Sequence, residues 1–217
     1  MVDESKLRVL VIAPEAPGCE PLAWLAEIGA IGEIEGVALA VACGPGVTAA
    51  AAARALRRGA DVIIWSGHGR ENGLLLGDGA TVNGKWLATQ VKSGCPRLAV
   101  IAACGSAVKD ARLRSLVGEL SQAGVNAIGF PLATADRAAV GYNVELVRAL
   151  VAGADVGTAH EIAVEGIAAG DPHTAAGAFL VPGLVNGYRA LLDRMEGFEA
   201  RLAHIERALE GIAARMK

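Results

Sequence analysis

A histidine and a cysteine each follow an apolar run of the sequence, and together they could carry out nucleophilic chemistry. His68 comes shortly after the run Asp61–Trp65, and Cys104 comes directly after Leu98–Ala103. An imidazole beside a thiol lowers the thiol pKa and accepts its proton, and the thiolate is the attacking species. If the two runs are neighbouring strands of a parallel sheet, both residues lie at its carboxyl edge, where the active groups of such sheets collect. The pattern therefore predicts a His68–Cys104 catalytic dyad.

Backbone amides beside the dyad could complete a catalytic site. Gly69 follows His68 and has no side chain to screen its N–H, and Cys104 has a backbone N–H of its own. Two such donors stabilise the oxyanion that forms when a thiolate attacks a carbonyl. Asp136 is a candidate substrate-pocket residue, because a carboxylate pairs with Arg or Lys. Its alternative role is to cap the helix that it opens.

Ordinary structural roles remain alternatives for these residues. A cysteine is more often a small buried hydrophobic residue than a nucleophile, which is how we interpret Cys19, Cys43 and Cys95. A caspase-like scaffold that keeps both dyad side chains but lacks an open pocket is a second functional hypothesis. A small nucleotide-binding module is a third hypothesis, and it would use the turn Gly44-Pro45-Gly46. That turn lacks the third glycine of the dinucleotide-binding pattern, which disfavours this hypothesis.

The elements that must position the dyad alternate between strands and helices. Continuous apolar strands are typical of parallel sheets covered on both faces, so residues 1–183 are predicted to form a three-layer α/β domain. Asp78-Gly79 between two apolar segments predicts a β-hairpin over Leu74–Val82. Strands are expected over Leu7–Ala13, Val37–Ala42, Asp61–Ser66, Arg97–Ala103, Val125–Phe130 and Ala176–Val181, and helices over Thr48–Arg58, Trp86–Val91, Ala111–Ala123, Asp136–Val151 and Thr158–Ile167.

The end of the chain follows a different repeat. From Tyr188 to Met216, apolar residues recur at alternating spacings of three and four. This heptad pattern predicts a coiled coil, so residues 184–217 are expected to form a C-terminal helix that assembles a homo-oligomer through residues 188–216. An amphipathic helix folded back on its own domain is the alternative.

The stretch from Ala60 to Asp110 resembles the core of a CHAT domain, a bacterial branch of the caspase-like (clan CD) cysteine peptidases. Those domains carry a strand ending in His-Gly, a hairpin and helix, and a second strand ending in Ala-Cys. The chain has Ser66-Gly67-His68-Gly69 and Ala102-Ala103-Cys104-Gly105-Ser106 in that order. The resemblance implies a caspase-like fold with a mostly parallel sheet, His68 as general base, Cys104 as nucleophile and Gly69 as an oxyanion-hole amide.

The same resemblance implies a cysteine endopeptidase that cleaves a protein or peptide substrate. By this resemblance the chain is similar to regulated bacterial effectors of stress or phage-defence type. The activity of such effectors depends on assembly or on an activating protein partner. Two features depart from the family pattern. Gly105 stands where relatives often have a polar or acidic residue, and no 34-residue period indicates the tetratricopeptide repeats common beside CHAT domains.

Composition excludes several other classes of protein. With 20 Lys and Arg against 23 Asp and Glu, and only 4% aromatic residues, the chain has neither the basic charge nor the stacking groups of a nucleic-acid-binding protein. The charge balance likewise predicts no attraction to an anionic membrane. Four cysteines without C-x-x-C spacing, and four histidines away from them, predict no metal or organic cofactor. With no signal peptide and no membrane-length apolar segment, the expected location is cytoplasmic, with reduced thiols.

Overall fold

The computed structural model describes residues 5–70, 73–92, 94–104, 111–130, 136–172, 175 and 178–183. Their centre is a mixed sheet whose strands lie in the order β2-β1-β3-β6-β7-β8. The first five of these are mutually parallel, and β8 runs antiparallel to β7. Their bounds are β1 (Leu7–Pro14), β2 (Val37–Gly44), β3 (Val62–Arg70), β6 (Leu98–Cys104), β7 (Asn126–Gly129) and β8 (Phe179–Val181).

The predicted hairpin is present beside the carboxyl end of β3. Strand β4 (Gly73–Leu75) pairs antiparallel with the last residues of β3 and with β5 (Thr81–Val82). At the turn, the Asp78 carboxylate accepts a hydrogen bond from the N–H of Ala80 at 3.1 Å. This is the Asx-type contact that makes Asp-Gly a good turn sequence.

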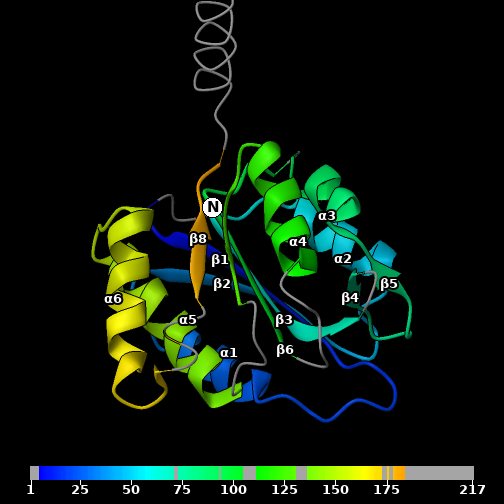
Figure 1. The fold of residues 1–217 in the computed structure, drawn as a ribbon, viewed down its shortest axis with the longest axis horizontal. Coiled ribbons are helices and arrows are strands. Elements are labelled where there is room, and N and C mark those ends of the chain that lie inside the picture. The colour runs from blue at the N-terminus through cyan, green and yellow to red at the C-terminus, as the bar shows by residue number, and fades with distance from the viewer. Residues whose placement is uncertain are drawn as a thin grey trace, which may run out of the picture. The chain divides into compact units, whose positions relative to one another are not determined.

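Helices cover both faces of the sheet, so three layers are formed (Figure 1). On one face lie α1 (Trp24–Gly32), α5 (Asp136–Val151) and α6 (Val156–Ala168), and on the other lie α2 (Ala49–Arg57), α3 (Gly84–Val91) and α4 (Ala111–Gln122). Successive strand residues alternate between two hydrophobic cores. Val9 and Val11 pack on the α1 side, whereas Leu10 and Ile12 pack on the α2 side. Burial of both strand faces is why the strands read as continuous apolar runs.

The α/β class, the mostly parallel sheet and the predicted strands are confirmed, and several elements differ from the prediction in their bounds or were not expected. Helix α1 was not expected, because the residue before it, Ala23, provides no side-chain cap. Helix α6 begins two residues early, where the Asp155 carboxylate accepts from the N–H groups of Gly157 and Thr158 at 2.9 and 3.1 Å. Strand β3 continues to Arg70 rather than ending at Ser66, because β6 and β4 pair with its last residues. The coiled-coil prediction for residues 184–217 lies outside the described residues.

The contact between α5 and α6 predicts a dependence of stability on pH. The Tyr142 hydroxyl and His160 Nδ1 are 2.6 Å apart, and burial lowers the pKa of His160. A neutral ring accepts the phenol proton at Nδ1, whereas a protonated ring cannot. Because the unfolded chain binds this proton more readily, the free energy of unfolding should fall as pH drops below about 6.5, the ordinary pKa of His.

Urea unfolding between pH 8 and pH 5 measures this effect. His160→Gln keeps a hydrogen-bonding side chain but removes the titrating ring, so its stability should fall less over the same interval. Identical pH dependences for the two proteins would contradict the assignment to His160.

Candidate active site

Strands β3 and β6 place His68 and Cys104 side by side. Their parallel register pairs Val62 with Leu98 at one end and His68 with Cys104 at the other. Neighbouring strands lie about 4.8 Å apart, so the two backbones are direct neighbours at the carboxyl edge of the sheet. The condition on which the predicted dyad depends, that the two strands are neighbours, is therefore met.

The side chain of His68 lies on the face of the sheet covered by α1, α5 and α6. Val62 and Ile64 of β3 pack into the core on that face. Because side chains alternate along a strand, Ser66 and His68 follow them on the same side. Their contacts agree, since both side chains bond to residues in or just before α1.

The loop before α1 holds the imidazole of His68. Its Nε2 lies 2.8 Å from the backbone carbonyl oxygen of Glu20. A carbonyl oxygen only accepts hydrogen bonds, so Nε2 must carry a proton. In the neutral ring Nδ1 is then the basic nitrogen. The ring is half-buried, and it is held in a tautomer that can accept a proton through Nδ1.

A buried polar cluster of Glu27, Ser66 and Asn143 lies next to this residue on the same face. Glu27 in α1 is 1% exposed, and Asn143 in α5 is fully buried. One carboxylate oxygen of Glu27 accepts a hydrogen bond from the hydroxyl of Ser66, and the other accepts from Asn143 Nδ2 at 2.5 Å. The sequence analysis missed this cluster, because the three residues come from three elements and share no spacing.

The other predicted residues lie as follows. Gly69 is part of β3 and pairs with Leu74 of β4. Asp136 is the first residue of α5, and its side chain lies outside the described part of the structure. The same holds for the side chain of Cys104, whose backbone ends β6.

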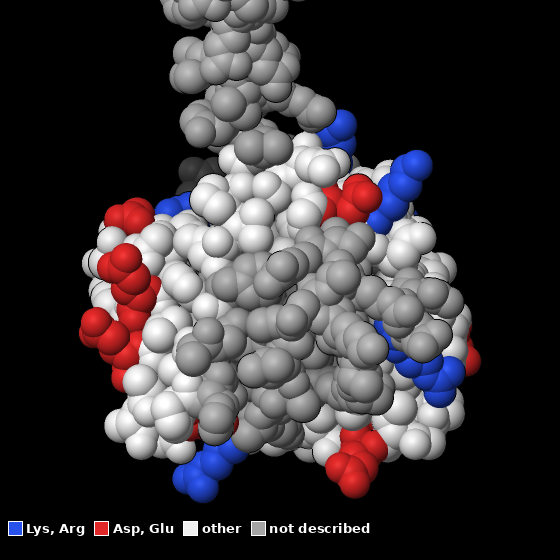
Figure 2. Space-filling view, in the orientation of Figure 1, with Lys and Arg blue, Asp and Glu red and all other residues white. Residues whose placement is uncertain are grey.

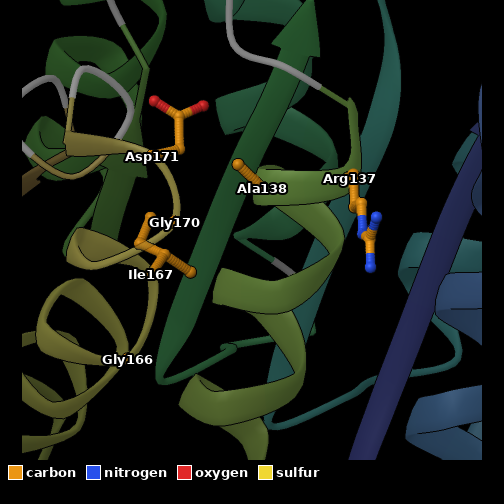
Figure 3. Close-up of a pocket in the computed structure, with 6 residues that line it drawn as sticks. All are labelled: Arg137, Ala138, Gly166, Ile167, Gly170 and Asp171. Carbon is orange, nitrogen blue, oxygen red and sulfur yellow. The ribbon is translucent and has the colours of Figure 1, made fainter.

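A pocket of about 440 Å³ lies between the start of α5 and the end of α6. Its charged lining residues are Arg137 and Asp171, whose side chains point away from each other (Figure 3). The floor is built from small or apolar residues, namely Ala138, Gly166, Ile167 and Gly170. The pocket therefore lies beside Asp136, the predicted substrate-pocket residue. Its lining includes the guanidinium of Arg137, which the sequence analysis did not single out.

The turn Gly44-Pro45-Gly46, considered above for phosphate binding, supports the hairpin. The N–H of Gly77, between β4 and β5, donates to the carbonyl of Val47 at 2.9 Å. A Cβ placed on Gly77 would lie 2.4 Å from the carbonyl oxygen of Pro45, so the two backbones are in close contact. This packing gives the turn a structural role.

Charge and ligand-type side chains are dispersed over the described residues. On the face in Figure 2, the described acidic side chains gather along α6, where Glu161 and Glu165 are exposed, whereas basic ones are scattered. Within the described ranges, no three His, Cys, Asp or Glu side chains come close enough to share a metal ion. Nor does this part of the chain contain a helix with the length and hydropathy of a membrane span.

Comparison with known proteins finds similarity in structure but not in sequence. No protein-family model matches the chain, and no curated protein matches its sequence. Gingipain R (RGPB), an Arg-specific cysteine proteinase, superimposes with a TM-score of 0.57 and 14% identity over 84% of this chain and 48% of its own. A complex of the pro- and mature domains of Porphyromonas gingivalis RgpB gives a TM-score of 0.54 and 13% identity, over 82% and 48%.

A pyridoxal kinase from Staphylococcus aureus aligns over 82% of the chain with 11% identity, but its TM-score of 0.41 is too low to indicate a shared fold. The chain spans about half the length of the gingipain chain that it matches. The described part of this protein therefore has an α/β fold, with a mostly parallel mixed sheet, similar to that of gingipain R.

Proposed function

We propose that this protein is a cysteine endopeptidase of the CHAT branch of caspase-like peptidases, with Cys104 as nucleophile and His68 as general base. The observation that carries the proposal is the register of β3 and β6, which pairs His68 with Cys104 at the carboxyl edge of the sheet. The carbonyl of Glu20 supports it, because it keeps the proton on Nε2 of His68 and leaves Nδ1 basic. Similarity of fold to an Arg-specific cysteine proteinase supports it further.

In the proposed mechanism, Nδ1 of His68 takes the thiol proton of Cys104, and the thiolate attacks the carbonyl carbon of a peptide bond. The backbone N–H groups of Gly69 and Cys104 receive the oxyanion. The C–N bond then breaks, and the imidazolium of His68 gives its proton to the leaving amine. Water, deprotonated by the same nitrogen, hydrolyses the acyl-enzyme and restores the thiol.

Substrate and regulation follow from the resemblance to CHAT domains and belong to the same proposal. The substrate is a protein or peptide, and Asp136 contributes to its pocket. Activity depends on assembly through residues 188–216 or on an activating protein partner, as in effectors of stress or phage-defence type. No cofactor takes part in the proposed steps.

Thiol alkylation tests the dyad without knowledge of the substrate. At pH 6.5, iodoacetamide should label Cys104 at least about tenfold faster than Cys43, because an imidazole beside a thiol lowers its pKa from about 8.5. Cys43 is the matched control, since it is exposed, whereas the exposed Cys95 thiol donates to the carbonyl of Lys92 at 3.3 Å. Peptide mass mapping gives the rate at each cysteine.

The variant His68→Ala should bring Cys104 down to the rate of Cys43. Equal rates for Cys104 and Cys43 in the unaltered protein, with no change in His68→Ala, would instead indicate a scaffold without an activated thiol.

A further inference from the structure

We infer that Glu27 is a positioning residue for His68: its buried carboxylate fixes helix α1, and with it the loop whose Glu20 carbonyl sets the tautomer of His68. The inference rests on the proposed function for its catalytic meaning. Its structural basis is the contact of one carboxylate with two other elements of the fold.

Helix α1 packs against the core through the partly buried side chains of Trp24, Ile28 and Ala30, but few of its side chains are fully buried. Of its nine residues only Glu27 and Ile31 are fully buried, and Leu25 is 70% exposed. Ala23, the residue before its first turn, makes no capping hydrogen bond through its side chain. In the amino-terminal half of α1, Glu27 is therefore the one fully buried side chain, and its hydrogen bonds add direction to the apolar contacts of Trp24 and Ile28.

The hydrogen bonds of Glu27 connect α1 to the strand that carries the dyad histidine. Ser66 donates from β3, two residues before His68, and Asn143 donates from α5. Burial of a carboxylate is costly unless hydrogen bonds compensate, and such bonds are stronger and more directional than those between neutral groups. A weakly buried helix held in this way has a defined position relative to β3.

That position controls the carbonyl of Glu20. Residues 15–23 connect β1 to α1, and Glu20 lies in this loop, seven residues before Glu27. The bond from His68 Nε2 is 2.8 Å long, and hydrogen bonds weaken steeply beyond about 3.2 Å. A shift of α1 would break it and allow the proton to move to Nδ1. In that tautomer Nδ1 cannot accept the thiol proton.

Two substitutions at Glu27 separate geometry from charge. Glu27→Gln keeps the shape and can still accept from Ser66. Its amide can donate to Asn143 Oδ1 once the Asn143 amide, whose Nδ2 now faces Glu27, turns over, because that Oδ1 has no hydrogen-bond partner among the described residues. Glu27→Leu removes both hydrogen bonds. Ring ¹⁵N chemical shifts of the full chain at pH 8.5 report the tautomer, with His68→Gln identifying the resonance of His68.

The unaltered protein and Glu27→Gln should show a single Nε2–H tautomer for His68. Glu27→Leu should show a mixture, and its Cys104 labelling should slow in proportion to the fraction of the Nδ1–H tautomer, because an imidazole in the wrong tautomer is a poor base. Ile31→Ala is the matched control, since it removes the other buried side chain of α1 and should leave the His68 signals unchanged.

The inference is overturned if Glu27→Leu keeps the single tautomer and the labelling rate, or if Ile31→Ala produces the same mixture. Should Glu27→Leu not fold, Ser66→Ala removes one of the two donors and is read in the same way. Slow labelling of Cys104 in the unaltered protein would count against the proposed peptidase instead, while the ¹⁵N shifts would still decide whether Glu27 positions His68.

Discussion

Replacing Cys104 with serine should lower peptide hydrolysis by about 10⁴-fold or more, since removal of the nucleophile in hydrolases of this type has effects of that size. The hydroxyl of serine is a far weaker acid than a thiol, and the dyad is built to activate a thiol. The partner of His68 is the neutral carbonyl of Glu20 rather than a carboxylate, so it orients the ring without adding negative charge. A serine at position 104 would therefore stay protonated.

A mixed peptide library, with products identified by mass spectrometry, measures this loss and also finds the preferred residue at the cleavage site. Cys43→Ser is the control, because that thiol is exposed at the far edge strand β2 and should not affect hydrolysis. Hydrolysis that survives in Cys104→Ser would exclude Cys104 as the nucleophile.

Strand β3, which carries His68, was predicted from the sequence only in part. The apolar run from Asp61 predicts β3, whereas its pairing with the run before Cys104 entered the prediction of the dyad only as a condition. The glycines at 67 and 69 suggest a turn, yet β3 continues through them to Arg70, because β6 and β4 supply pairing on both sides. Pairing partners distant in sequence overrode the local signal.

The partners of His68 could not be found in the same way. The Glu20 group that bonds its ring is a backbone carbonyl, which every residue possesses, so no residue type marks it. Glu27 lies in a segment for which the sequence predicted no helix, and only the packing of α1 and α5 against β3 makes it a buried acceptor. A site made of tertiary contacts leaves no spacing in the sequence.

Asp136 illustrates a residue whose place in the fold was predicted, while its role stays a prediction. The start of α5 was expected correctly at this residue, and a pocket does lie beside it. The lining includes the next residue, Arg137, with Asp171 from beyond α6. The substrate-pocket role of Asp136 itself stays a prediction, because its side chain lies outside the described part of the structure.

Gly77→Ala should destabilise the protein by about 3 kcal/mol or more, the cost of forcing atoms into closely packed backbone. The new Cβ would lie 2.4 Å from the carbonyl oxygen of Pro45 and 2.8 Å from that of Gly44. Both are backbone atoms, so no flexible side chain can move aside. Relief requires the hairpin to withdraw, which breaks the hydrogen bond from Gly77 to Val47.

Thermal and urea unfolding measure the loss, and a chain of this size should melt about 6–12 °C lower. Gly46→Ala is the matched control in the same turn, because a Cβ there meets nothing within 4 Å and its φ is not in the left-handed region. It should be neutral or stabilising by up to about 1 kcal/mol. Since β4 pairs with Gly69, a displaced hairpin in Gly77→Ala should also disturb the strand end beside His68 and slow the labelling of Cys104. Equal stability of the two variants would mean that the hairpin does not rest on this turn.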